Sequence, residues 1–188
     1  AIALFCSVGG VEPQSETVWR QADRYRVPRL AFINKMDRVG ADFFGVLEQM
    51  KKKLRAHPVP VQIPFGAEEN FRGIVDLIEG CAYVFSEDKL GVEFERAEVP
   101  IELKAEYDEW REKLMEVAAE HDEQLIERYL DGETLDPGEI RASLRAQTVA
   151  SKITPVVCGS AFKNKGVQQL LDAVIDFMPS PVDIPPIE

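Results

Sequence analysis

The hydrophobic pattern predicts alternating strands and helices in the first part of the chain. Residues 1–7 form one continuous apolar run, which ends at a pair of glycines, and residues 29–34 form another. Runs of this kind are typical of strands buried on both faces of a parallel sheet. Between them the spacing predicts a helix of about three turns with Val18, Ala22 and Tyr25 on its apolar stripe.

A second helix is predicted after Gly40. Its apolar positions repeat at intervals of three and four residues: Phe43, Val46, Leu47, Met50 and Leu54. Lysines occupy residues 51–53, on the last turn of this helix. Positive charge is favourable at the negative end of the helix dipole, so this run of lysines does not by itself indicate a ligand.

The pattern changes at His57-Pro58. Four short β-like runs follow, separated by Gly, Asn, Asp and Pro, and after Pro100 come a long acidic helix and two further helical runs. The third of these begins with Asp136-Pro137-x-Glu139, which predicts a capped helix start. A buried strand at 153–159 and a final helix that ends before Pro179 then resume the earlier alternation.

This order predicts an α/β fold, a parallel sheet with helices on both faces, interrupted by an inserted α+β subdomain. The core would comprise residues 1–55 and 151–178, the insert residues 56–150, and a linker-like tail residues 179–188. The charge distribution marks the same boundaries. The insert holds 23 acidic and 9 basic residues, a net charge of −14, whereas the remainder has 10 acidic and 13 basic residues, a net charge of +3.

Such an acidic block cannot by itself bind nucleic acid, because phosphates would be repelled. It is either a solvated face or a surface for a basic protein partner. The three cysteines are far apart in sequence and are expected to be free thiols, and neither histidine has the spacing of a metal ligand. No apolar run is long enough to cross a membrane, and the aromatic residues Trp19, Tyr107 and Trp110 are expected in the core.

The clearest chemical motif is Asn34-Lys35-Met36-Asp37, which follows directly from the second predicted strand. Nucleotides bind at the carboxyl ends of parallel strands. A carboxylate at Asp37 can accept two parallel hydrogen bonds, from the ring N–H and the exocyclic amine of guanine, whereas adenine offers neither donor in that arrangement. Asn34 could hold the loop and the other edge of the base, and the Lys35 stem could lie across the purine face.

A second loop fits the same site. The predicted strand at 153–159 runs into Ser160-Ala161, where a backbone N–H could point at the guanine carbonyl oxygen and the serine hydroxyl could brace the Asp37 carboxylate. The 122 residues between Asp37 and Ser160 far exceed the roughly 30 that one helix and one strand require. The surplus is enough for a small folded insert, in agreement with the charge distribution.

Three long stretches carry a family resemblance: residues 10–43, residues 73–80 and residues 153–181. With the NKMD motif they resemble elongation factor G, a ribosomal translocase driven by GTP, more closely than release factor three or the tetracycline-protection proteins. The resemblance implies a partial P-loop-type GTPase fold and a guanine-binding set of Asn34, Lys35, Asp37, Ser160 and Ala161. Phe162 stands where the family usually has leucine.

The resemblance also implies cofactors and partners. GTP or GDP would be bound, with Mg²⁺ held by parts of the parent protein outside this chain. The parent would act in the cytoplasm on the ribosome, moving tRNA and mRNA, and the insert would meet the large-subunit stalk protein. No phosphate-binding G-x-x-x-x-G-K-[ST] sequence occurs in these residues, and no catalytic or metal-ligating residue is assigned.

We therefore expect this chain alone not to hydrolyse GTP, to bind guanine nucleotide weakly or not at all, and to self-associate through an exposed apolar sheet edge. An alternative comes from a different class of function. The chain could be a protein-binding module in which the acidic insert binds a basic partner and the flanking elements are a scaffold without nucleotide function.

Overall fold

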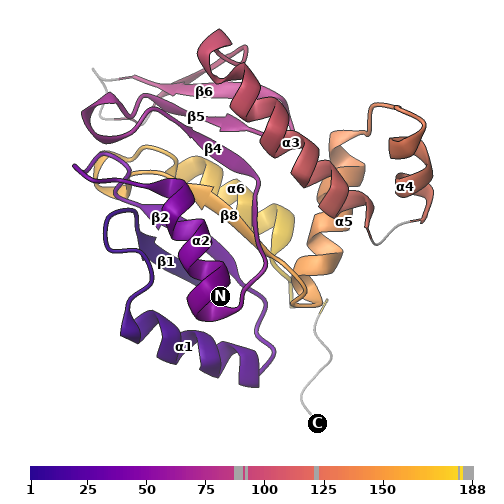
Figure 1. The fold of residues 1–188 in the computed structure, drawn as a ribbon, viewed down its shortest axis with the longest axis horizontal. Coiled ribbons are helices and arrows are strands. Elements are labelled where there is room, and N and C mark those ends of the chain that lie inside the picture. Colours follow the sequence, from indigo (N-terminus) through magenta and orange to yellow (C-terminus); the bar gives the residue numbers. More distant parts are fainter. Residues whose placement is uncertain (87–90, 92, 121–122, 182, 184–188) are drawn as a thin grey trace.

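A computed structural model describes residues 1–86, 91, 93–120, 123–181 and 183 (Figure 1). These residues form two four-stranded sheets, one parallel and one antiparallel, with helices packed around them. The α/β fold predicted from the sequence is confirmed. The predicted tail at 179–188 lies largely outside the described residues.

The parallel sheet has the strand order β1 (Ile2–Cys6), β2 (Leu30–Asn34), β8 (Thr154–Cys158) and β3 (Pro58–Pro60). Cys6 is in register with Asn34, and Ile33 is in register with Cys158. The three main strands therefore end at one edge of the sheet. Because the strands lie between helices, their apolar runs become core: β8 is buried throughout, and so is β2 up to its last residue.

Helices cover both faces of this sheet. α1 (Pro13–Arg24) and α2 (Phe43–Leu54) lie in front of it in Figure 1, and α6 (Val167–Phe177) lies behind it. The predicted stripe of α2 is confirmed, since all five of its apolar positions are buried. Asp42 caps the start of the helix, and its side chain accepts a hydrogen bond from the Gly45 amide at 2.9 Å.

The predicted stripe of α1 is wrong in phase. Trp19 is buried, as expected, but Val18 and Tyr25 are exposed. Val18 faces the outer side of β1, where it lines an apolar groove of about 250 Å³ together with Ile2 and Leu4. β1 is the last strand on this side of the sheet, and 64% of Leu4 is exposed. The apolar sheet edge expected from the sequence is therefore present among the described residues.

The second sheet is an antiparallel meander of β4 (Gln62–Phe65), β5 (Gly73–Asp76), β6 (Cys81–Phe85) and β7 (Phe94–Ala97). Beside it lie α3 (Lys104–Ala119), α4 (Glu123–Leu130) and α5 (Pro137–Val149) (Figure 1). The predicted cap of α5 is confirmed: the Asp136 side chain accepts from the Gly138 amide at 2.8 Å, and Glu139 accepts from the Asp136 amide at 3.2 Å. Tyr107 of α3 is also buried, as expected.

The run at residues 58–65, which reads as one β-like segment, is divided between the two sheets. β3 pairs in parallel with β8, whereas β4 pairs antiparallel with β5. The parallel sheet thus takes its fourth strand from within residues 56–150. Among the described residues, none of the helices combines the length and apolar composition that crossing a bilayer requires.

Candidate functional site

The carboxyl edge of the parallel sheet brings together the two loops that the sequence singled out. The NKMD loop follows β2 and the loop at residues 159–161 follows β8, and these strands are neighbours. The Met36 amide donates to the Gly159 carbonyl at 3.1 Å, and the Gly159 amide donates to the Ile33 carbonyl at 3.0 Å. Residues more than 120 positions apart in sequence are thereby joined through their backbones.

Asn34 links the two loops through its side chain. Its Oδ1 accepts hydrogen bonds from the Lys35 amide at 2.8 Å and from the Ala161 amide at 2.9 Å. The Ala161 N–H, expected to point at a guanine carbonyl oxygen, is directed at Asn34 in this structure. A backbone N–H can be shared between two acceptors in a three-centre bond, so this contact leaves Ala161 able to approach a base.

Lys35 has an unusual backbone conformation that shapes the NKMD loop. Its φ of 66° lies in the left-handed region, which a residue with a Cβ adopts at a cost. Two hydrogen bonds hold it there: its amide binds Asn34 Oδ1, and its carbonyl accepts from the buried Ser7 hydroxyl at 2.8 Å. The Lys35 side chain is exposed, as its expected position over the face of a base requires.

Asp37 is a nearly buried carboxylate that stays ionised. Its side chain is 10% exposed, and the Lys163 ammonium lies 3.4 Å from its Oδ2. Burial pushes the pKa of Asp37 upward, but the Ser160 hydroxyl, the Asp37 amide and the Lys163 ammonium together lower it below its usual value. The site therefore presents an acceptor-only group to an incoming ligand.

Ser160 lies beside Asp37 and is buried. Although its hydroxyl lowers the pKa of Asp37, Ser160 Oγ makes no hydrogen bond of full geometry to the described residues. The hydroxyl therefore lies close to the carboxylate but is not aligned with it. A buried hydroxyl without a full partner is costly unless a further polar group completes its bonding, which fits a site built around a polar ligand.

Three further residues hold this site, and the sequence analysis assigned no role to them. Ser7 and Lys163 contact the site as described above. Glu68, between β4 and β5, donates its amide to the Met36 carbonyl at 2.8 Å, and its Oε1 accepts from the Gly40 amide at 2.8 Å. The position of Ser7 at the end of the first predicted strand could have indicated from the sequence that it lies at this site. Glu68 has no such sequence signal, because its contact depends on how the insert folds back.

The insert also contacts the second loop. The buried Lys165 donates its ammonium to the Phe71 carbonyl at 2.8 Å. Phe162, in contrast, is 93% exposed and so does not contribute to the packing of this loop. Both loops of the candidate site are thus held in part by the segment between β4 and β5, at residues 68 and 71.

Comparison with known proteins agrees with this geometry. The family model of the elongation factor Tu GTP binding domain matches residues 1–180 of the sequence. The chain belongs to this family of GTP-binding domains. A crystal structure of a protein from Thermus thermophilus has the same fold, with a TM-score of 0.83 and 28% sequence identity over 97% of this chain.

The chain covers 27% of that Thermus protein, so it spans about a quarter of the length of this relative. Family membership makes guanine nucleotide the ligand class of the domain. The donor and acceptor set at the carboxyl edge of the sheet suits that ligand: an ionised Asp37, a Ser160 hydroxyl without a full partner and an exposed Lys35 stem.

Proposed function

We propose that this GTP-binding domain supplies the guanine-recognition part of an elongation factor of the G type. The observation that carries the proposal is the ionised, nearly buried Asp37 at the loop that Asn34 ties to Ala161. Guanine would offer its ring N–H and exocyclic amine to the two carboxylate oxygens. Adenine would leave the carboxylate without donors in a poorly hydrated site, which is the physical basis of selectivity.

Each of the remaining residues has a role in this proposal. Asn34 positions the second loop, Ser160 braces the carboxylate, and the Ala161 amide turns in part toward the base carbonyl oxygen. The Lys35 stem covers one face of the purine while its ammonium stays in water. Lys163 leaves the carboxylate when the base arrives, because the guanine donors take its place. Bound GTP would supply the phosphoryl group whose hydrolysis drives the parent protein, and no residue of this chain is assigned to that step.

The test is nucleotide selectivity with Asp37→Asn, measured in this chain joined to the upstream part of a GTPase domain. Titrations compare guanosine, adenosine and xanthosine diphosphates. Because an amide donates where a carboxylate accepts, the variant should lose guanine affinity and gain affinity for xanthine, which carries a carbonyl in place of the amine. Asp131→Asn, at an exposed turn of the insert, removes the same charge and should leave selectivity unchanged.

Unchanged selectivity in Asp37→Asn would refute base recognition by Asp37. The same result, or an absence of nucleotide binding, would favour the alternative of a protein-binding module. For the chain on its own we propose no GTP hydrolysis, and measurable turnover would contradict this.

The insert is proposed to contact the ribosomal stalk protein, as the resemblance to elongation factor G implies. What supports this is the exposed acidic face of α3, where Glu112 and Glu116 have no ion-pair partner among the described residues. Reversing both charges with Glu112→Lys and Glu116→Lys should weaken binding to purified stalk protein. Reversal of Glu12 and Asp172, which are exposed outside the insert and likewise have no ion-pair partner among the described residues, is the matched control, and equal loss in both variants would refute a specific contact.

A further inference from the structure

A second hollow lies at the opposite edge of the parallel sheet, where β8 and β3 begin and where α1 and α2 end. It is a cleft of about 700 Å³. The strands that separate it from the guanine-recognition loops are five residues long, about 16 Å at 3.3 Å per residue. The cleft is therefore distinct from the site described above.

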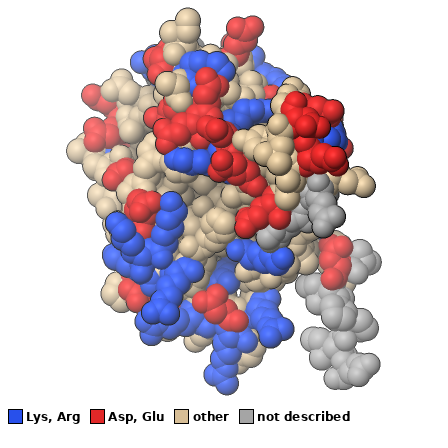
Figure 2. All heavy atoms as spheres, turned by 45° about the vertical axis from the view of Figure 1, so that its right-hand side comes forward, with Lys and Arg blue, Asp and Glu red and all other residues tan. Residues whose placement is uncertain are grey.

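The cleft is strongly basic in a chain whose net charge is −11. Six basic residues line it, with two acidic ones: Arg20, Arg29, Lys52, Lys53, Arg55 and Lys152 against Glu16 and Asp23. Figure 2 shows lysines and arginines gathered on the lower part of the molecule and acidic residues gathered on its upper part. Charges beyond about 10 Å are largely screened at 0.1 M salt, so the distant acidic insert does not cancel this local field.

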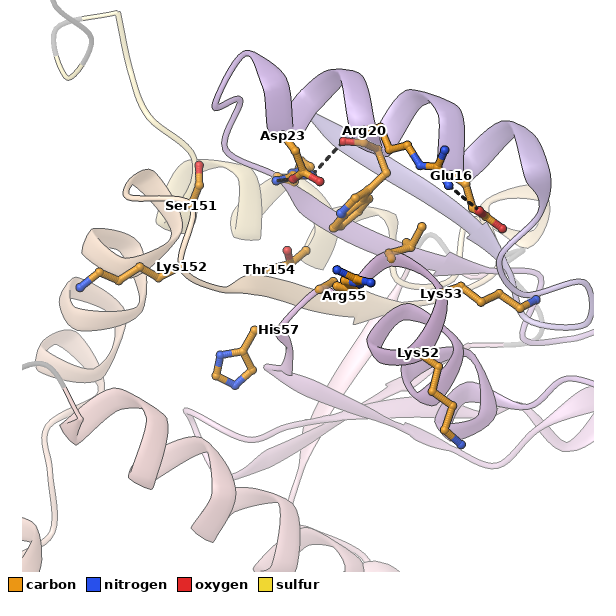
Figure 3. A pocket seen from close by; sticks show the side chains of 14 residues that line it. Glu16, Arg20, Asp23, Lys52, Lys53, Arg55, His57, Ser151, Lys152 and Thr154 are labelled. Atoms are coloured by element: carbon orange, nitrogen blue, oxygen red, sulfur yellow. Dashed lines mark hydrogen bonds and ion pairs between the residues drawn. The ribbon is translucent and has the colours of Figure 1, made fainter.

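Ion pairs within the cleft account for only part of its positive charge. Arg29 is buried, pairs with Asp23 at 2.6 Å and lies 4.2 Å over the Trp19 ring, so it forms a fixed, neutralised floor. On α1, Arg20 pairs with Glu16 at 3.4 Å. Both acidic residues of the cleft are thus already paired, and a dashed line in Figure 3 marks the pair of Arg20 with Glu16.

The other four basic residues have weak, neutral or no partners. Lys52 is 3.8 Å from Glu48, and Lys53 donates at 3.0 Å to the neutral Val11 carbonyl and Gln49 side chain. Arg55 and Lys152 have no acidic partner among the described residues. In Figure 3, Arg55 lies centrally, whereas Lys52 and Lys53 from α2 and Lys152 from the segment before β8 point away from it, so these three charges lie around the rim of the cleft.

The dipole of α2 explains its own lysines but not this arrangement. Arg20 and Lys152 come from two other segments, and Arg55 is the residue that follows the last turn of α2. Arg55 also follows the helix in a left-handed conformation, with a φ of 52°, at a position where glycine is usual. An arginine held there against its backbone preference directs a guanidinium fork into the cleft, and this group binds phosphate in a bidentate manner.

We propose that this cleft binds phosphate groups. Its volume accommodates several of them, and the four basic residues whose charge no acid in the cleft offsets are complementary in sign to a polyphosphate or to a single-stranded RNA backbone. These two sources share one chemistry, so the experiment uses a probe for each. Inorganic tripolyphosphate represents free phosphate compounds, and a twelve-residue oligouridylate represents RNA without any guanine that could enter the Asp37 site.

The test compares the unmodified 188-residue chain with the double variant Arg55→Gln, Lys152→Gln. Both side chains are exposed, so the fold should be retained. Each phosphate contact on a single strand contributes a salt slope of about 0.7, hence about fivefold in affinity at 0.1 M salt. We expect the double variant to bind oligouridylate about 25-fold more weakly and its salt slope to fall by about 1.4. The control, Arg72→Gln with Lys104→Gln, removes two exposed charges on the insert and should bind as the unmodified chain does.

Each result decides the matter. If the cleft variant loses oligouridylate binding and the control variant does not, the proposal is supported with RNA as the source of the phosphate. If the cleft variant loses only tripolyphosphate binding, the proposal is supported with a free phosphate compound as the source. Failure of both probes to bind, or equal loss in the cleft and control variants, overturns it. Polyglutamate of matched charge is a further probe. If it binds as tightly as the phosphate probes and loses the same affinity in the cleft variant, the assignment to phosphate is overturned. Asp37→Asn should leave both probes unaffected, which separates this outcome from the proposed guanine recognition.

Discussion

The Asn34 side chain is the most informative single group to remove, because one oxygen atom joins the NKMD loop to the loop at residues 159–161. In Asn34→Ala, the amides of Lys35 and Ala161 lose an acceptor that lies 2.8 and 2.9 Å away. A hydrogen bond of this kind contributes about 0.5–1.5 kcal/mol, so two give about 2 kcal/mol. Asn34 is half-buried and water can replace part of this, which leaves an expected loss of about 1.5 kcal/mol.

For a domain of this size, 1 kcal/mol corresponds to roughly 2–4 °C in Tm, so we expect Asn34→Ala to unfold about 3–6 °C lower. Circular dichroism during heating measures the shift, and hydrogen exchange locates it, because the Ala161 amide should lose protection. Asn34→Asp keeps the acceptor oxygen and should recover most of the stability. Asn70→Ala, at an exposed position, is the matched control.

The reasoning fails if Asn34→Ala unfolds at the wild-type temperature with Ala161 exchange unchanged. The loops would then be held by the backbone bonds of Met36 and Gly159 alone. It also fails if Asn34→Asp is as unstable as Asn34→Ala, because the retained acceptor oxygen would then contribute nothing.

Three further predictions concern ionisation and packing around the same sheet. The pKa of Asp37 is lowered, so its contribution to stability is present above about pH 4 and is lost as the pH falls through the folded-state pKa. In Lys163→Gln this pKa should rise, as an NMR titration would measure, and the loss of stability at low pH should be smaller. An unchanged pKa would contradict the ion pair. Glu68→Ala removes the acceptor of one backbone amide and should cost about 1 kcal/mol in chemical unfolding, against no change for Glu69→Ala. Burial raises the pKa of the Cys158 thiol, so Cys158 should be alkylated only as the chain unfolds, whereas the less buried Cys6 should react in the folded protein. Mass spectrometry after timed labelling measures the order of reaction, and alkylation of Cys158 before Cys6 would contradict this prediction.

Local pattern determined most of the elements, because hydrophobic periodicity reports directly which face of an element is covered. The stripe of α2 and the capped start of α5 both appear as predicted. For α1 the same reasoning failed. Val18 belongs to an apolar stripe in sequence, but it lies beside the outer edge of β1, where no strand of the described chain covers it.

The meeting of the two loops proposed to recognise guanine could be predicted from the sequence, because the carboxyl ends of neighbouring parallel strands lie at one edge of the sheet. The sequence alone therefore places Asn34, Asp37 and Ser160 close together. The supporting contacts could not. Glu68 reaches the NKMD loop only because the insert folds back over it, and no local spacing encodes that approach.

The division of residues 58–65 between two sheets and the basic cleft were likewise decided by tertiary structure alone. Strand pairing depends on the partners available, so β3 joins β8 although its sequence runs on into β4. The lysines at residues 51–53 look like dipole compensation when α2 is considered alone. They become part of a cleft only when folding places Arg20, Arg55 and Lys152 around the same hollow, since charge density in three dimensions follows from which chain segments become neighbours.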